Sequence, residues 1–129
     1  MGTDFVKFAS TFRVVCKTPE MFAIKGDIRE VLAFLSGLYI GMYRLAGDAD
    51  ETVQDPLDGF NKWLAQEDGI QANRDWSKTA YEVLKIYDEP DALQRLLALF
   101  DRYIKDQMGM TPESYQINLF DSDPGSLAN

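Results

Sequence analysis

The amino-acid sequence predicts a mainly α-helical fold: a compact bundle of four main helices, with an N-terminal arm or short strand and an irregular C-terminal tail. Two observations carry this prediction. Apolar residues recur at spacings of three and four along four successive segments, as they do on one face of a helix. Aspartate stands at or just before the start of each segment, where a helix N-terminus favours it. With 129 residues and 46% hydrophobic content, the chain suits one core, so we expect a single domain over residues 1–129.

The N-terminal arm, residues 1–26, carries a mixed pattern. Phe5, Phe8 and Phe12 follow helical spacing, whereas apolar residues at 12, 14 and 16 alternate as in a strand. Pro19 then interrupts any regular element. We therefore expect a short strand or an irregular arm in front of a helical core at 27–108.

The first predicted helix, residues 28–46, has the strongest signals. Asp27, followed three residues later by Glu30, forms a capping box, and apolar residues continue beyond it at helical spacing. Apolar side chains also occupy its other faces, so we expect this helix to run through the centre of the domain. Gly37 and Gly41 lie one turn apart, which predicts the close approach of a neighbouring backbone.

Two shorter helices are predicted next, at residues 56–68 and 76–87. The pair Asp55-Pro56 places a capping residue before a proline in the first helical turn. Asp75 is placed to cap the second of these helices in the same way. Both starts are therefore defined by local sequence alone.

The fourth predicted helix covers residues 90–107. Acidic residues gather around Pro90 at its start, and Arg102 and Lys105 stand near its end, as the helix dipole prefers. Residues 109–129 contain prolines and acids but no basic residue, and we expect either a short ordered strap or a frayed end. A strap would use four apolar residues: Tyr115, Ile117, Leu119 and Phe120.

Ten residues on the apolar stripes are predicted to be mostly buried. They are Leu32, Leu35, Tyr39, Phe60, Trp63, Val83, Leu84, Leu93, Leu97 and Phe100. Trp63 and Trp76 both lie on such stripes, so core packing is expected for them rather than an exposed contact role. Cys16 stands in an apolar stretch and is expected to be a buried small hydrophobe, with a reactive thiol as the alternative.

The charge balance restricts the class of partner. The chain has 21 acidic and 13 basic residues and a net charge of −8, which disfavours direct binding to nucleic-acid phosphates. An acidic surface suits a basic protein partner instead. The sequence has no long apolar run and no basic segment followed by an apolar one at its start. We therefore expect no membrane span, no secretory signal and a cytoplasmic location.

The residues of common catalytic and metal chemistry are missing from the sequence. The chain has no histidine, and its one cysteine cannot complete a Cys/His zinc site. No Gly-rich phosphate loop and no nucleophile elbow occurs either. We therefore expect a protein that is not an enzyme and that uses no cofactor or metal.

The densest negative charge lies between residues 47 and 75. Seven carboxylates there are the candidates for partner binding: Asp48, Asp50, Glu51, Asp55, Asp58, Glu67 and Asp68. A solvated acidic loop, a partner-docking patch and a metal or catalytic site are the interpretations that remain open. A calcium loop is not matched, because the stretch that begins at Asp48 lacks the central glycine and the glutamate at the twelfth position.

Five segments follow one another in an order that resembles a group of small bacterial proteins. Those proteins have a basic-Pro-x-Met-aromatic opening, a Phe-Leu-x-Gly-Tyr helix, a Phe-x-x-Trp-Leu helix, a Trp near a serine, and a late helix rich in Leu and Phe. The corresponding segments here are residues 17–22, 32–39, 60–64, 75–77 and 92–100. The pattern differs at two points, since Leu38 separates the glycine from the tyrosine and Trp76 precedes the serine. Many members of the group look like immunity proteins encoded beside toxins of contact-dependent and polymorphic toxin systems.

The resemblance implies a protein that binds and neutralises a cognate toxin. An acidic surface is suited to cover a basic active-site or substrate groove, which makes a nuclease the favoured toxin. A helical adaptor or chaperone in a secretion or regulatory complex is the alternative, and a small hydrolase that uses carboxylates is the third reading. A neighbouring gene for a large secreted protein with a variable C-terminal domain would favour the immunity protein.

Overall fold

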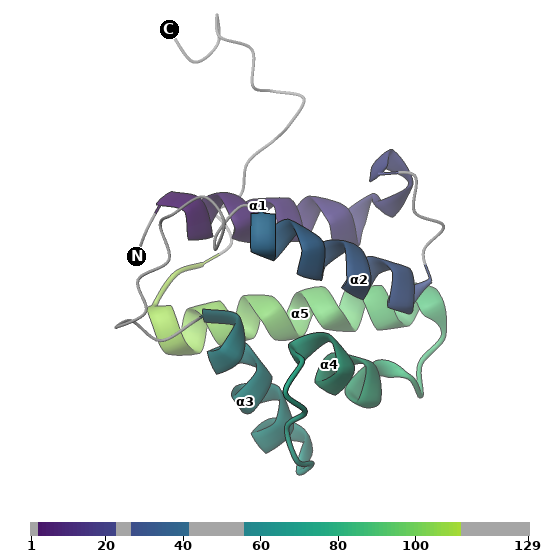
Figure 1. Cartoon of the computed structure of the whole chain (residues 1–129), viewed down its shortest axis with the longest axis vertical. Helices are drawn as coiled ribbons and strands as arrows, with labels where there is room; N and C mark the ends of the chain where they lie inside the picture. The colour runs from purple at the N-terminus through teal and green to yellow at the C-terminus, as the bar shows by residue number, and fades with distance from the viewer. Residues whose placement is uncertain (1–2, 23–26, 42–55, 112–129) are drawn as a thin grey trace, which may run out of the picture.

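The computed structural model describes residues 3–22, 27–41 and 56–111 (Figure 1). Its elements are α1 (Thr3–Lys17), the short 3-10 helix η1 (Pro19–Phe22), α2 (Ile28–Tyr39), α3 (Pro56–Asp68), α4 (Trp76–Leu84) and α5 (Glu89–Met108). The described residues contain helices and no strand. The prediction of a mainly α-helical bundle is therefore confirmed.

The N-terminal segment is a helix, so the prediction of a short strand or irregular arm is wrong. Helix α1 spans Thr3–Lys17 and fully buries Phe8, Phe12 and Val15, which lie at helical spacing on one face. Val14, which the strand pattern would place on the same side as Phe12, is only half-buried. Helical spacing prevails because a helix can lay one apolar stripe along a neighbouring helix. The segment is therefore part of the core and not an appendage to it.

Helix α2 begins where the sequence predicts. The Asp27 side chain accepts a hydrogen bond of 2.8 Å from the backbone N–H of Arg29, which satisfies one of the free donors of the first turn. The helix is described as far as Tyr39, with Ile40 as its C-cap. Residues 42–46, the end of the predicted helix, lie outside the described residues.

The predicted close approach of a backbone at Gly37, on α2, and Gly41, just after it, is not found among the described residues. Gly37 and Gly41 are both exposed. A Cβ atom added at either position would meet no described atom within 4 Å. Both glycines face solvent because the buried stripe of α2 runs along the opposite side, through Leu32 and Leu35.

Helices α3 and α4 form a hairpin whose turn is fixed by polar side chains. The Asn61 amide donates to the backbone carbonyl of Asn73 at 2.6 Å, and the Asn73 N–H donates to the Thr79 hydroxyl at 2.8 Å. Asp75 caps α4 by accepting a hydrogen bond of 3.0 Å from the backbone N–H of Ser77. The predicted start of this helix is therefore confirmed.

Helix α4 ends at Leu84, three residues before the predicted end. The backbone N–H of Tyr87 turns back to the Leu84 carbonyl at 3.0 Å, which closes a turn between α4 and α5. Helix α5 then begins at Glu89 with Pro90 in its first turn and ends at Met108. Its C-cap is Gly109, whose φ of 68° is accessible to glycine at little cost.

Helix α5 occupies the middle of the bundle, with α1 and α2 on one side and α3 and α4 on the other (Figure 1). It packs against all four of these helices, which its length of 20 residues, about 30 Å, makes possible. The prediction that the helix at 28–46 is central is therefore wrong for its described part, α2. None of the helices in the described ranges is long and apolar enough to cross a membrane.

The core agrees with the predicted set in most positions. Eight of the predicted residues are buried: Leu32, Leu35, Tyr39, Phe60, Trp63, Leu84, Leu93 and Phe100. Val83 and Leu97 are half-buried and pack against the core from its edge. The sequence-based set lacked Phe8 and Phe12, because the helical nature of α1 was not recognised.

Candidate functional site

The predicted acidic surface is only partly described by the structure. Four of its seven residues, Asp48, Asp50, Glu51 and Asp55, lie outside the described residues. The other three, Asp58, Glu67 and Asp68, all lie on α3. Helix α3 therefore places the described part of the predicted site along one element.

Two of the three described carboxylates take part in surface ion pairs. Asp58 lies 3.0 Å from the Lys62 ammonium, one turn further along α3, and Glu67 lies 3.1 Å from the Arg102 guanidinium of α5. Asp68 is exposed. Exposed ion pairs of this kind contribute about 0–1 kcal/mol to stability. Basic groups of a partner can therefore replace Lys62 and Arg102 beside these carboxylates at little cost.

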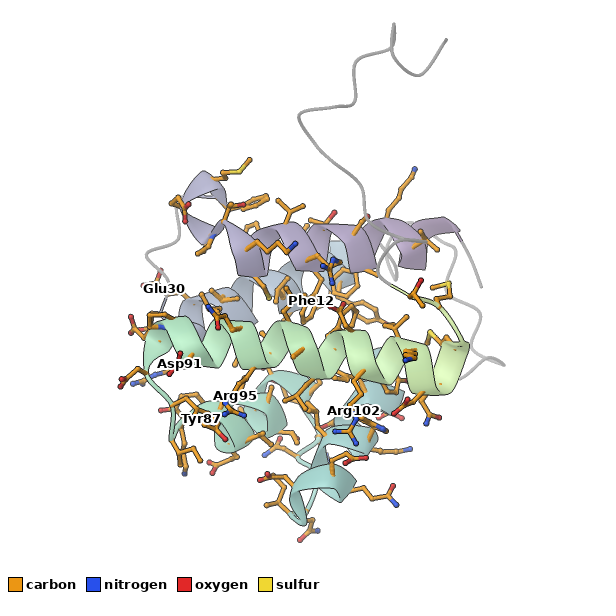
Figure 2. The ribbon with its side chains drawn as sticks, turned by 180° about the vertical axis from the view of Figure 1, so that it is seen from behind. Phe12, Glu30, Tyr87, Asp91, Arg95 and Arg102 are labelled. Carbon is orange, nitrogen blue, oxygen red and sulfur yellow. The ribbon has the colours of Figure 1, made fainter. Side chains whose placement is uncertain are left out.

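A second group of carboxylates lies where α2 and α5 begin. Asp88, Glu89 and Asp91 surround the start of α5, and Glu30 lies in the first turn of α2. Figure 2 places Glu30 and Asp91 at the same end of the molecule. Among the described residues, none of these four carboxylates has an ion pair. The sequence suggested only that the acids at the start of α5 favour the helix dipole.

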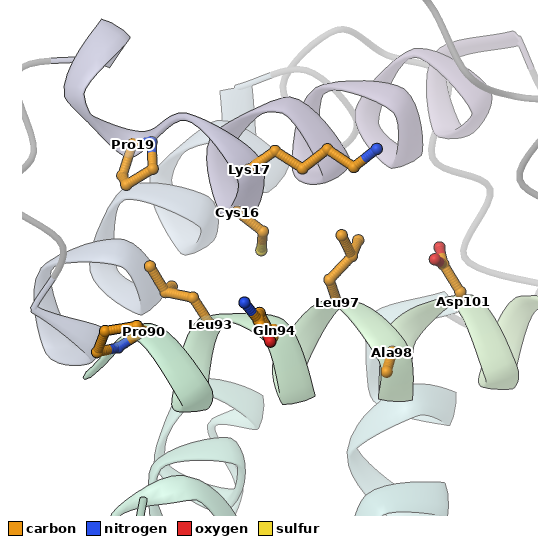
Figure 3. Close-up of a pocket in the computed structure, with 9 residues that line it drawn as sticks. All are labelled: Cys16, Lys17, Pro19, Pro90, Leu93, Gln94, Leu97, Ala98 and Asp101. Atoms are coloured by element: carbon orange, nitrogen blue, oxygen red, sulfur yellow. The ribbon is translucent and has the colours of Figure 1, made fainter. Parts of the chain in front are cut away.

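An open groove of about 510 Å³ runs between α1 and α5 (Figure 3). Cys16 and Leu93 are buried at its floor, and Leu97 is half-buried beside them. Its remaining lining residues are Lys17, Pro19, Pro90, Gln94, Ala98 and Asp101. The groove is mainly apolar and is large enough to receive an apolar side chain of another molecule.

Cys16, the thiol of this groove, is chemically protected. Its side chain is only 7% exposed, as the interpretation of a buried small hydrophobe predicts. Burial raises the pKa of the Cys16 thiol far above its ordinary value, the Asp101 carboxylate raises it further, and the Arg13 guanidinium lowers it. The thiolate is the nucleophilic form, so Cys16 is unreactive at neutral pH.

A charged pair joins the two walls of the groove. Arg13 of α1 is 8% exposed, and its guanidinium donates to the carboxylate of Asp101 on α5. No local sequence pattern signals this pair, because its partners are 88 positions apart. A buried charge needs such a partner, so the pair fixes the register of α1 along α5.

The described part of the chain offers no cluster for metal binding. Within the ranges 3–22, 27–41 and 56–111, no group of three or more His, Cys, Asp or Glu side chains is placed to hold a metal ion. The described features that can bind another molecule include charged helix ends and the apolar groove between α1 and α5.

Comparison of the chain with protein-family models, curated proteins and solved structures gives no match.

Proposed function

We propose that this chain is an immunity protein that binds a cognate bacterial toxin and neutralises it by covering a basic active-site or substrate groove. One observation carries the proposal: most of the negative charge lies in two short segments of the sequence. Residues 42–55 and residues 112–129 each have a net charge of −3, so together they hold most of the total of −8. The rest of the chain is close to neutral.

Both acidic segments join the described bundle at the same end, which we call the acidic end. In Figure 1 the C-terminal ends of α2 and α5 and the N-terminal end of α3 lie together at the left. A ring contact between α3 and α5 agrees with this placement: Phe60 lies 5.3 Å from Tyr103. Asp58 lies close to this end, in the first turn of α3.

Acidic charge that is concentrated in this way favours a basic partner. Complementary charge raises the association rate, and it does so most for a partner whose own site concentrates positive charge. Nucleases concentrate lysine and arginine in the groove that holds the nucleic-acid backbone. A nuclease toxin is therefore the favoured target, and the resemblance to immunity proteins supports the same class of partner.

The test begins with co-expression of the chain and the C-terminal domain encoded by the gene immediately upstream. We expect the chain to restore growth, to co-purify with the domain and to bind it with measurable affinity. Failure to bind and failure to protect would together contradict the proposal.

The acidic end is tested by charge removal with a matched control. The triple variant Asp50→Asn, Glu51→Gln, Asp58→Asn should slow association about tenfold at low salt and flatten the salt dependence. The control, Glu20→Gln, Asp27→Asn, Asp75→Asn, removes as much charge elsewhere, and asparagine at 27 and 75 still serves as a helix cap. Equal effects of the two variants would mean that only net charge matters and not its position.

The second candidate function, a helical adaptor or chaperone, is favoured by the apolar groove between α1 and α5. A chaperone needs an apolar surface that receives a segment of its client, and the groove offers one beside Leu97. Co-purification with the product of a neighbouring gene for a secretion component, and loss of that binding on Leu97→Lys, would favour this function.

A further inference from the structure

The turn between α4 and α5 presents an isoleucine to solvent. Ile86 exposes 76% of its surface, against 49% for Ile40 and 36% for Ile70. A single exposed apolar side chain is ordinary on a protein surface, so exposure alone assigns no role to it. The surroundings of Ile86 distinguish it, and we name them the α4–α5 corner: residues 85–91 together with Glu30 of α2.

The backbone of the α4–α5 corner is held in place. The Lys85 N–H donates to the Tyr81 carbonyl at 2.8 Å, and the Tyr87 N–H donates to the Leu84 carbonyl at 3.0 Å. The Arg95 guanidinium lies 4.0 Å from the centre of the Tyr87 ring, which is a close cation–π contact (Figure 2). Ile86 is therefore presented by an ordered turn, so little conformational entropy is lost when a partner covers it.

In the α4–α5 corner, the basic side chains have partners within the chain, whereas the carboxylates have no ion pair among the described residues. Lys85 lies 2.7 Å from Glu82, and Arg95 lies over Tyr87. The carboxylates of Glu30, Asp88, Glu89 and Asp91 have no ion pair among the described residues.

Asp88 stands at the N-cap position of α5, yet its side chain makes no capping hydrogen bond. Its carboxylate is thus free to accept hydrogen bonds from another molecule. A partner that brings basic side chains to this rim gains charge-assisted hydrogen bonds and displaces no existing ion pair there.

We propose that the α4–α5 corner is the docking surface for the toxin, which receives Ile86 in an apolar pocket surrounded by basic residues. This inference rests on the proposed function and names its contact surface. Ile86 is followed directly by Tyr87, which Arg95 contacts, and carboxylates follow at the start of α5. An exposed apolar side chain next to a tyrosine and an arginine is typical of the contacts that contribute binding energy in protein interfaces. The acidic end of the bundle then accelerates the encounter from a distance, and the corner holds the complex together.

The test compares Ile86→Ser with Ile70→Ser in the full chain. Ile70 lies in the turn between α3 and α4, and the two variants make the same chemical change. Ile86→Ser should accelerate dissociation from the upstream-encoded toxin domain about tenfold or more, with little change in association, because a buried anchor acts on the dissociation rate. Ile70→Ser should leave both rates within about twofold. Thermal unfolding of each free variant verifies that the fold is intact.

The rim is tested separately with Asp88→Asn combined with Asp91→Asn. This variant should weaken binding and reduce its salt dependence, since two carboxylate charges that would face basic groups of the toxin are lost. The triple variant at the acidic end should instead act on association alone. This kinetic difference separates a docking surface from remote attraction.

The outcomes separate this inference from the proposed function. If the wild-type chain does not bind the toxin domain, the proposed function is overturned and the docking surface falls with it. If the wild-type chain binds and Ile86→Ser binds equally well, only the α4–α5 corner is overturned. Equal weakening by Ile70→Ser would also overturn the corner, because the effect would then come from general loss of apolar surface.

Discussion

The seam between α1 and α5 and the hairpin of α3 and α4 are held by different kinds of contact. The seam joins residues 88 positions apart: the rings of Phe12 and Phe100 stack at 3.9 Å, and Arg13 pairs with Asp101 beside them. The hairpin joins residues close in sequence, and hydrogen bonds of polar side chains fix its turn. Burial stabilises the seam, whereas local geometry defines the turn of the hairpin. We therefore expect mutations in the seam to lower the free energy of unfolding more than mutations in the turn of the hairpin.

The largest effect is expected for Phe100→Ala. Phe100 is fully buried, stacks on Phe12 and meets the Phe60 ring edge-on at 5.4 Å, so its removal leaves a cavity at the centre of the bundle. The free energy of unfolding, measured by urea denaturation, should fall by about 3–5 kcal/mol. The control is Leu97→Ala on the same helix, where the half-buried side chain faces the groove and the loss should be about 1 kcal/mol. Equal losses would mean that the stacked rings do not form the centre of the core.

The next effect concerns the charged pair of the seam. Asp101→Asn removes the carboxylate charge that faces the buried Arg13 guanidinium, and we expect a loss of about 2–3 kcal/mol. This value is below that of a fully buried pair, because the Asp101 side chain is 21% exposed. Combining Asp101→Asn with Arg13→Met should recover part of the loss, since no buried charge remains. A double variant that loses the sum of the two single losses would contradict a direct coupling.

A smaller effect is expected in the hairpin, for Asp75→Ala. The carboxylate of Asp75 accepts from the Ser77 N–H, and loss of a helix cap costs about 1 kcal/mol. Asp75→Asn should retain most of this contribution, because asparagine caps helices equally well. Both variants are measured by the same urea denaturation. A loss above about 3 kcal/mol for Asp75→Ala would show that the turn contributes as much as the seam.

The smallest effect on stability is expected from Cys16, which reports on the groove beside the seam. Its raised pKa keeps the thiol protonated in the folded chain, so alkylation by iodoacetamide at pH 8 should be about a hundredfold slower than in urea. Below the ordinary thiol pKa of 9.0 the thiol is neutral in both the folded and the unfolded chain. As the pH rises above this value, only the unfolded thiol ionises, so the free energy of unfolding falls. Wild-type protein should therefore lose more stability above pH 9 than Cys16→Ala does. Fast alkylation of the folded chain would contradict the burial of Cys16.

Some ion pairs of the candidate site can be predicted from the sequence, because their partners are close in the chain, and others cannot. The pair of Asp58 and Lys62 is visible in the sequence, because residues four apart on a helix are neighbours. The pair of Glu67 and Arg102 is not visible, since it joins two helices that are distant in the chain. Sequence reasoning found the acids around Pro90 but assigned them only to the helix dipole. Their freedom from ion pairs, and the exposure of Ile86 beside them, follow from how α2, α4 and α5 are packed.

The sequence by itself determined the helical class, the acidic charge and the starts of α2, α3 and α4, because caps and helical periodicity act within a few residues of the chain. Only the tertiary structure decided that residues 3–17 form a helix, that α5 is the central element and that Arg13 meets Asp101. Phe12 and Val14 are compatible with both a strand and a helix in isolation. The stripe of Phe8, Phe12 and Val15 becomes favourable as a helix only when α2 and α5 supply the apolar surface that buries it, and no local window of sequence contains that surface.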